Sequence, residues 1–338
     1  MTHPVTPARA PLAGAAADDA AADDAAGGTL GAALLVAGAA CCFGAISTLA
    51  VVATRAPAPG APGVALETVL TWRYLLAGVV LLPIAAAGRR RAGARPVTAR
   101  EGALAVLFGG LGQAAVAFLT ISAVRWIPVA TVGFLFYTFP AWVAVLAAVR
   151  GTDRLDGPKL GALALSLGGI ACTVGLPGPA GPGAGGPAWP GVVLALVGAV
   201  VYALYIPYLG RLQARLTPAG AATAVCAGAA AILGAAALAR GTFTAILAPA
   251  AWGAVAVLAL VCTVVAFLAF MRGLGRLGPV RTAIVSTVEP FFTAVLGAVA
   301  LAQPFGPATL VGGALIAAAV LLLQRRPTAG ERAPAPAG

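Results

Sequence analysis

The chain contains R-W-I-P-V-A-T at residues 125–131 and R-L-G-P-V-R-T at residues 276–282, two copies of the pattern R-x-x-P-V-x-T placed 151 residues apart. Pro140 then corresponds to Pro290 at a spacing of 150, and a further run of apolar residues matches at the same spacing. Each copy lies between two long apolar stretches. The sequence is therefore an internal duplication of segments long enough to span a membrane.

Apolar residues dominate the composition. The 338 residues are 61% hydrophobic and 9% charged, with a mean hydropathy of +0.98. A water-soluble chain of this length could not cover its surface with so little charge. Ten apolar stretches approach the roughly 20 residues that cross a bilayer. They are residues 30–53, 64–87, 102–123, 127–149, 158–176, 190–209, 217–239, 250–271, 280–302 and 307–324.

The ten stretches divide into five per copy. Because five is odd, the second copy must enter the membrane from the opposite side. The sequence therefore predicts an all-α integral membrane protein of ten transmembrane helices, arranged as two inverted five-helix repeats. Inverted repeats around a binding site at the membrane midplane are typical of secondary transporters.

The expected organisation has five parts. A disordered cytoplasmic tail at 1–28 precedes the first repeat at 29–176, a Gly/Pro-rich linker at 177–189 precedes the second repeat at 190–325, and a second disordered cytoplasmic tail occupies 326–338. The first tail has almost no large apolar side chains to bury, so it favours disorder. Its acidic residues before the first apolar stretch do not fit a signal peptide.

The net charge is +11 and the isoelectric point is near 10.5, which might indicate a nucleic-acid partner. The distribution of the charge indicates a membrane instead. With both termini inside, 17 of the 21 basic residues fall in cytoplasmic segments; Arg55, Arg125 and Arg240 lie outside, and Arg73 lies within a span. This asymmetry follows the positive-inside rule. We expect a multi-pass protein of the cell (inner or plasma) membrane, with cytoplasmic termini and no nucleic-acid partner.

Two ionisable residues lie deep within predicted spans. Arg73 and Glu289 each lie nine residues into a span, about 13 Å deep, and the two spans enter the membrane from opposite faces. Both therefore lie near the bilayer centre, where an ionisable side chain indicates a functional site. We expect Arg73 to attract an anionic group, and Glu289 to bind a cationic group or a proton. The alternatives are a structural ion pair between the two, or an arginine held by backbone carbonyls.

Three prolines lie at a similar depth in the predicted spans. Pro290 removes one helical hydrogen bond, so carbonyls near Val285 and Ser286 need other partners, which a water-filled cavity can supply. Pro140 is its counterpart in the first repeat, and Pro207 is a third predicted helix breaker. Polar and aromatic residues at similar depth are further candidates for substrate binding as a group, although each alone is more often a packing or interfacial residue. They are Trp72, Tyr74, Gln113, Tyr137, Tyr202 and Tyr205.

Other chemistry has little support. The five cysteines lie in apolar stretches, and the only histidine is His3 in the tail, so we expect no metal site and no cofactor. There is no phosphate-binding loop of the Walker type, so ATP is not expected to drive this chain. The pairs Gly109-Gly110, Gly168-Gly169 and Gly312-Gly313 predict close helix contacts.

The order and spacing of these motifs resemble the EamA-type members of the drug/metabolite transporter superfamily. W-R-Y at 72–74 is similar to the family's second span, F-x-F-Y-T-x-P at 134–140 to its fourth, and V-E-P-F at 288–291 to its ninth. The resemblance covers about residues 29–325. Members usually carry a glutamate after the fourth and ninth spans, where this chain has Asp153 and Gln303. We interpret that position as a loop or cap feature.

The resemblance implies movement of small metabolites, commonly export. We therefore predict a secondary transporter, and no enzyme, that exports an amino acid, a derivative or a drug-like compound by alternating access. Its two halves would rock about a midplane cavity containing Arg73, Tyr74, Tyr137 and Glu289. Glu289 would be protonated or bound to the substrate in one facing state and released in the other, and coupling to protons stays open. One alternative is an importer or exchanger of a phosphorylated or nucleotide-linked sugar, although only Arg73 is a base within a span. The other is a membrane-embedded enzyme, although no span contains a histidine. The oligomeric state stays open.

Overall fold

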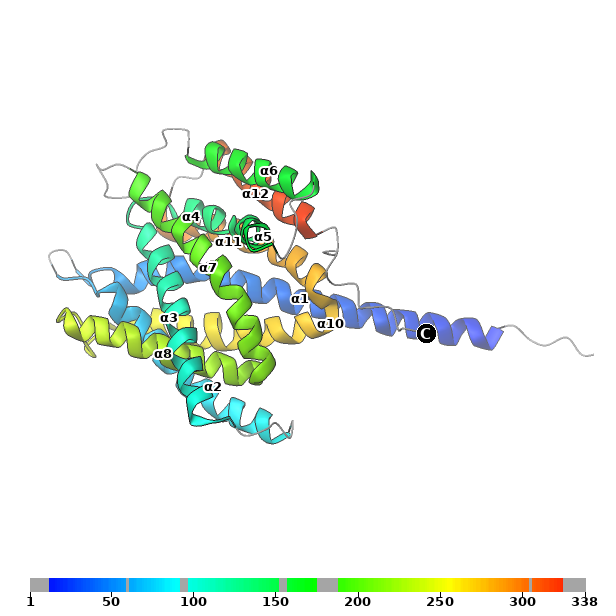
Figure 1. Ribbon diagram of the computed structural model, residues 1–338, viewed down its shortest axis with the longest axis horizontal. Helices are drawn as coiled ribbons and strands as arrows, with labels where there is room; N and C mark the ends of the chain where they lie inside the picture. The colour runs from blue at the N-terminus through cyan, green and yellow to red at the C-terminus, as the bar shows by residue number, and fades with distance from the viewer. Residues whose placement is uncertain are drawn as a thin grey trace, which may run out of the picture.

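A computed structural model describes residues 12–58, 61–91, 97–151, 157–174, 188–303 and 306–324, and these residues form helices and connections without strands. Figure 1 shows the resulting helical bundle. The elements are α1 (Leu12–Thr54), α2 (Leu66–Arg91), α3 (Ala99–Ala123), α4 (Val129–Phe136), α5 (Phe139–Val149), α6 (Gly157–Val174), α7 (Trp189–Arg215), α8 (Pro218–Ala239), α9 (Pro249–Ala259), the π-helical turn η1 (Leu260–Val265), α10 (Ala266–Ser286), α11 (Val288–Leu301) and α12 (Pro307–Gln324).

The bundle has the apolar character that the composition predicts. Seven helical segments are long and apolar enough to cross a membrane. Three shorter apolar helices accompany them, at Gly157–Cys172, Val288–Leu301 and Pro307–Leu322. Each of the ten predicted stretches thus contributes to a helical segment, but three of these segments are shorter than a full span. The all-helical membrane fold is confirmed, whereas a count of ten complete spans stays a prediction.

Helix α1 begins before the first apolar stretch. Its backbone is helical from Leu12, where the sequence favoured a disordered tail up to residue 28. The segment is rich in alanine, the residue with the highest intrinsic helix propensity, which explains why a helix can extend there without an apolar face. In Figure 1 this part of α1 extends away from the bundle. The predicted tail at 326–338 and most of the linker at 177–189 lie outside the described residues.

Two predicted spans are broken at their prolines. The stretch 127–149 forms α4 and α5, which are separated at Tyr137 and Thr138, and Pro140 lies in the first turn of α5. In the second repeat the break falls at Thr287, three residues before Pro290. Helix α10 therefore runs through residues 272–279, where a loop between two spans was expected. The helix is interrupted where a proline removes a helical hydrogen bond, and not in the arginine-containing segment 272–279.

The expectation that Pro207 breaks a helix is wrong. Helix α7 continues without interruption from Trp189 to Arg215, with Pro207 inside it. Pro207 lies on the exposed surface of the bundle, where its ring does not have to fit against a neighbouring helix. A membrane helix tolerates such a proline by small local adjustments.

The helices of the two repeats interleave. The most extensive contacts join α2 to α8, α6 to α12, α3 to α8, α1 to α10 and α3 to α7, and every one of these pairs takes one helix from each repeat. Figure 1 shows α6 and α12 side by side at one edge of the bundle. If the two repeats are exchanged, the contact between α3 and α7 corresponds to the contact of α1 with α9 and α10. In the same way, the contact between α1 and α11 corresponds to the contact between α5 and α7. Some helix contacts therefore recur in both repeats, as expected for a duplication.

Glycines allow the closest of these contacts, as predicted. A side chain on Gly110 would collide with the Gly228 backbone where α3 crosses α8. A Cβ atom on Gly169 would lie 2.7 Å from the Gly312 carbonyl oxygen, at the contact of α6 with α12. Gly313 faces the ring of Phe134 in the same way. Each of the three predicted glycine pairs thus places at least one glycine at a close helix contact.

Candidate functional site

Glu289 lies at the break between α10 and α11 and meets Tyr137 from the break between α4 and α5. The Tyr137 hydroxyl is 2.8 Å from Glu289 Oε2 and 2.8 Å from the Ser286 carbonyl oxygen. Ser286 is four residues before Pro290, so this is the carbonyl that loses its helical partner to the proline ring. The sequence predicted that this carbonyl needs a partner, and the partner is a tyrosine from the other repeat.

A second hydroxyl ties the first turn of α11 to α1. The Thr293 hydroxyl lies 3.0 Å from both the Glu289 and the Gly44 carbonyl oxygens. A Cβ atom at Gly44 would lie 2.8 Å from the Glu289 carbonyl oxygen and 2.9 Å from the Thr293 hydroxyl, so only glycine permits this approach. Glu289, Tyr137, Ser286, Thr293 and Gly44 form the group that we call the Glu289 cluster. It joins α1, α10 and α11 to the break between α4 and α5.

Arg73 belongs to a separate polar group. Its side chain is 5% exposed, its Nε donates to the Thr263 hydroxyl at 3.1 Å, and its guanidinium lies over the Tyr74 ring at 4.9 Å from the centroid. The Tyr74 hydroxyl in turn accepts from Gln113 Nε2 at 3.0 Å. These four residues form the Arg73 cluster, which joins α2, α3 and η1. Among the described residues, Arg73 is thus held by a hydroxyl and an aromatic face, and not by the backbone carbonyls that sequence analysis considered.

The position of Thr263 is unusual. It lies within the π-helical turn η1, and its hydroxyl donates to the Leu258 carbonyl oxygen at 2.8 Å. Short π-helical turns occur frequently at functional sites, because the extra residue redirects a side chain from the regular helix. Here the redirected side chain is the one that accepts the hydrogen bond of the buried arginine.

Arg73 and Glu289 do not form a pair. Within the described residues, no hydrogen bond or ion pair joins their side chains. Helix α1 explains the separation, since its two faces contact different clusters. Ala50 packs in the core that contains Tyr74, whereas Gly44 contacts the backbone of Glu289. The two charges therefore face different sides of α1, and their common depth in the bilayer stays a prediction.

The remaining aromatic candidates, Tyr202, Trp72 and Tyr205, lie in three different parts of the bundle. Tyr202 packs against Phe139 at 4.9 Å between ring centroids, and Phe139 packs against Tyr137 at 5.9 Å, so Tyr202 adjoins the Glu289 cluster. Trp72 points away from both clusters: its indole donates to the Thr244 carbonyl oxygen at 2.9 Å.

Tyr205 is a third case. Its hydroxyl donates to the Gly109 carbonyl oxygen at 2.9 Å, and its ring lines an apolar groove between α3 and α7. The structure therefore brings Tyr202 to the Glu289 cluster, whereas Trp72 and Tyr205 connect helices elsewhere.

Gln303 acts as a helix cap, as we interpreted this position from the sequence. Ala302 adopts the left-handed conformation, with φ of 51°, directly after the end of α11. The Gln303 side chain is thereby directed to α4, where its Oε1 accepts from the Val129 backbone N–H at 2.9 Å. This satisfies one free donor at a helix N-terminus. Asp153, the corresponding acid of the first repeat, lies outside the described residues.

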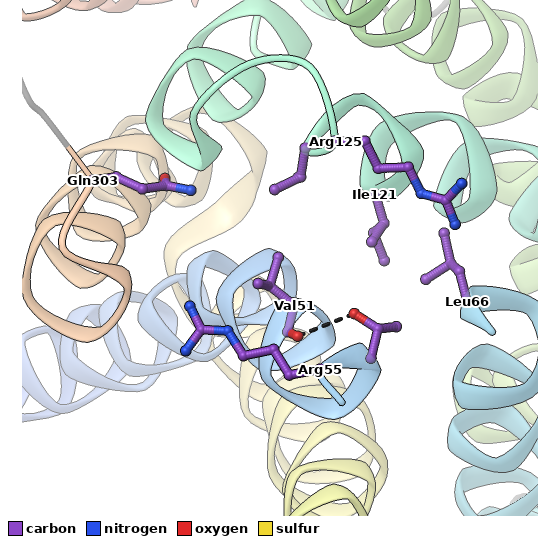
Figure 2. Close-up of a pocket in the computed structure, with 8 residues that line it drawn as sticks. Val51, Arg55, Leu66, Ile121, Arg125 and Gln303 are labelled. Carbon is purple, nitrogen blue, oxygen red and sulfur yellow. Dashed lines mark hydrogen bonds between the residues drawn. The ribbon is translucent and has the colours of Figure 1, made fainter. Parts of the chain in front are cut away.

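A cavity of about 330 Å³ lies next to Gln303 at the same end of the bundle. Figure 2 shows the residues around it, with Arg55 from the end of α1 and Arg125 from the end of α3 on opposite sides. The third predicted outer arginine, Arg240, is elsewhere: its Nε lies 3.6 Å from Glu67 Oε1. Glu67 also accepts from the Thr242 hydroxyl at 2.9 Å.

Sequence reasoning missed three of the residues that complete these clusters. Thr293 follows Glu289 by one helical turn, which is a signal that could have been used. Gly44 could not be singled out among 44 glycines, and Thr263 owes its role to a π-helical turn that has no sequence signature.

Interleaved apolar helices, breaks at paired prolines and buried charge define the class of this molecule as a multi-pass helical membrane protein. The chain belongs to the EamA-like transporter family, whose model matches residues 30–175 and 189–325. The two matches confirm the resemblance to EamA-type drug/metabolite transporters. The protein is thus a membrane transporter, with a small molecule as substrate and the lipid bilayer as surroundings.

Other comparisons add information on the fold alone. A solved structure described only as "Crystal structure of protein" has a TM-score of 0.57 and 21% sequence identity, and the similarity covers 86% of this chain and 95% of that chain. A comparison with curated proteins finds no significant match.

Proposed function

We propose that this protein is a secondary transporter of the inner or plasma membrane that exports an amino acid, an amino-acid derivative or a drug-like compound by alternating access. Both termini would be cytoplasmic, and ten helical segments in two inverted repeats would cross the membrane. The observation that carries the proposal is the contact of Glu289 with Tyr137. It places an acid on a broken helix of one repeat against a hydroxyl on a broken helix of the other.

The Tyr137 hydroxyl supports a role for protons. It has one hydrogen and two acceptors at 2.8 Å, the Glu289 carboxyl and the Ser286 carbonyl. If Glu289 is protonated, its carboxyl donates to the hydroxyl, the hydroxyl donates to Ser286, and every group is satisfied. If Glu289 is ionised, the single hydrogen can serve only one acceptor, and the other is left without it. Loss of the proton therefore leaves one hydrogen bond in place of two between the break of α4 and α5 and the break of α10 and α11.

The moving parts of such a transporter would not be the two repeats themselves. Helices from opposite repeats make the most extensive contacts, so one repeat cannot rotate as a rigid body against the other. We propose instead that α4, α5 and α11 move at their breaks. Glu289 would bind a proton or the cationic group of the substrate, and Arg73 would attract its anionic group from the other side of α1.

Efflux assays test the proposal. Cells with and without the protein are loaded with a panel of amino acids, N-acylated amino acids and cationic amphiphiles, and the rate of release is followed. We expect one class to leave faster with the wild type, and Glu289→Gln and Arg73→Ala to abolish the gain while inserting normally. Trp72→Phe is a matched control, because Trp72 faces neither cluster and should retain transport. Normal transport by both charge variants would contradict the proposed site.

The importer or exchanger of a phosphorylated or nucleotide-linked sugar remains a second candidate, and one observation favours it. Two arginines, Arg55 and Arg125, line one cavity at the predicted outer end. Counterflow of a labelled sugar phosphate into proteoliposomes separates the two candidates, because an amino-acid exporter should show none. Turnover of such a compound rather than its movement would instead favour the membrane-embedded enzyme.

A further inference from the structure

We infer that the cavity between Arg55, Arg125 and Gln303 is a binding site for an anionic group, a carboxylate or a phosphate, on a small amphiphilic substrate. We name this cavity the arginine vestibule. The inference deepens the proposed transport function and rests on it for the outward orientation of this end of the bundle. It assigns the substrate a negative charge, which the site near Glu289 does not.

The size and chemistry of the vestibule fit such a group. Its volume of about 330 Å³ lies at the lower end of the range of ligand pockets, roughly 300–1,000 Å³. Its walls include Val51, Leu66 and Ile121, which suit an apolar substituent. Its charged groups are both guanidiniums, whose planar arrays of N–H donors match carboxylate and phosphate oxygens.

The charge of the vestibule is not neutralised by the protein. Of the ten acidic residues, Glu67 is the only one on the predicted outer side of the bundle. Its carboxylate is occupied by Arg240 and Thr242, although the neighbouring Leu66 lines the vestibule. Within the described residues neither Arg55 nor Arg125 forms an ion pair. Of the three predicted outer arginines, Arg240 is paired with an acid, whereas the charges of Arg55 and Arg125 in the vestibule are not neutralised.

The vestibule is also placed to communicate with the Glu289 cluster. Gly44, Thr48 and Val51 follow each other at spacings of four and three along α1, so they share one face of the helix, and Arg55 follows Val51 by four residues, directly after the end of α1. Gly44 contacts Glu289, and Val51 and Arg55 line the vestibule. Between them, Thr48 is 2% exposed, and its hydroxyl has no hydrogen-bond partner in the part of the chain that the structure describes. This buried hydroxyl is therefore a polar group that lies between the two sites and is available to a bound molecule.

The test measures binding on the purified full chain, without a gradient. N-acetyl-L-leucine, which carries a carboxylate, is titrated against its neutral analogue N-acetyl-L-leucinamide, and stabilisation is followed by thermal unfolding in detergent. We expect only the carboxylate to stabilise the protein in a saturable way. Each exposed arginine should contribute about two- to five-fold to the affinity for the carboxylate. The Arg55→Gln/Arg125→Gln double variant should therefore bind N-acetyl-L-leucine about tenfold more weakly. Arg240→Gln is the matched control and should bind like the wild type.

Three results would overturn the inference: equal stabilisation by the amide, unchanged binding by the double variant, or equal weakening by Arg240→Gln. A lipid headgroup offers the same phosphate chemistry, so the titration is repeated in nanodiscs of phosphatidylcholine and of phosphatidylglycerol. If phosphatidylglycerol alone removes the binding, the vestibule belongs to lipid and the assignment to substrate fails. Because no transport is measured, this failure is distinct from a failure of the efflux assay.

Discussion

The Tyr137→Phe substitution removes one oxygen atom and tests the link between the two repeats. In the structure this hydroxyl serves the Ser286 carbonyl and the Glu289 carboxyl, both at 2.8 Å. A hydrogen bond to a charged group contributes about 1.5–3 kcal/mol, and a buried carbonyl left without a partner costs about 1–3 kcal/mol. Since one hydrogen cannot serve both acceptors fully, the two contributions overlap, and we expect a loss of about 2–4 kcal/mol in the free energy of unfolding.

Tyr205→Phe provides the comparison. Tyr205 is buried to a similar extent, 6% against 8% exposed for Tyr137, and its hydroxyl donates only to the Gly109 carbonyl oxygen. Its loss should cost about 1 kcal/mol and should not depend on pH. The assay is reversible denaturation of the purified protein between acid and neutral pH, combined with the rate of efflux at the same values. Because Tyr137 contacts a titratable carboxyl, the effect of its substitution should change across this range.

Two results would refute the reasoning. If Tyr137→Phe costs no more than Tyr205→Phe at every pH, the hydroxyl does not hold the two breaks together. If Tyr137→Phe is destabilised but its dependence on pH equals that of the wild type, Glu289 does not act through this contact. The Glu289→Gln variant completes the set, since its stability should not change with pH through this side chain.

Three further predictions concern stability and are measured by thermal unfolding. Gln303→Leu removes the acceptor of the Val129 N–H and should cost about 1–2 kcal/mol, whereas Gln303→Glu retains an acceptor and should cost little. Gly228→Ala inserts a methyl group into a backbone carbonyl of α3 and should prevent a stable fold, whereas Gly168→Ala, with open space around it, should be neutral or slightly stabilising. Ala302→Gly relieves a left-handed alanine on an exposed turn and should stabilise by about 1 kcal/mol.

Much of the fold could be predicted because it follows from local rules. Apolar length locates the helices, and proline removes a specific hydrogen bond, so the breaks near Pro140 and Pro290 and the need of Ser286 for a partner were accessible from the sequence. The same rule failed for Pro207, because whether a proline breaks a membrane helix depends on its surroundings. An exposed ring disturbs no neighbour, and exposure cannot be read from the residue itself.

The arrangement around the charges could be predicted only in part. Counting residues along a span predicts a depth for Arg73 and Glu289, but it does not predict the direction in which each side chain points around its helix. The two charges could therefore be placed near one level but not on different sides of α1. The partners Tyr137 and Thr263 come from helices far along the chain, and their roles follow from packing rather than from any local pattern.

The interleaving of the repeats has a consequence for how such a chain is made and how it arose. The first repeat has few contacts among its own helices, because α2 packs mainly on α8, α3 on α8 and α7, and α6 on α12. During synthesis the helices of the first half therefore have no complete core until the second half follows. For the same reason a single five-helix ancestor would have been stable only as an antiparallel pair, and gene fusion would have made that pairing permanent.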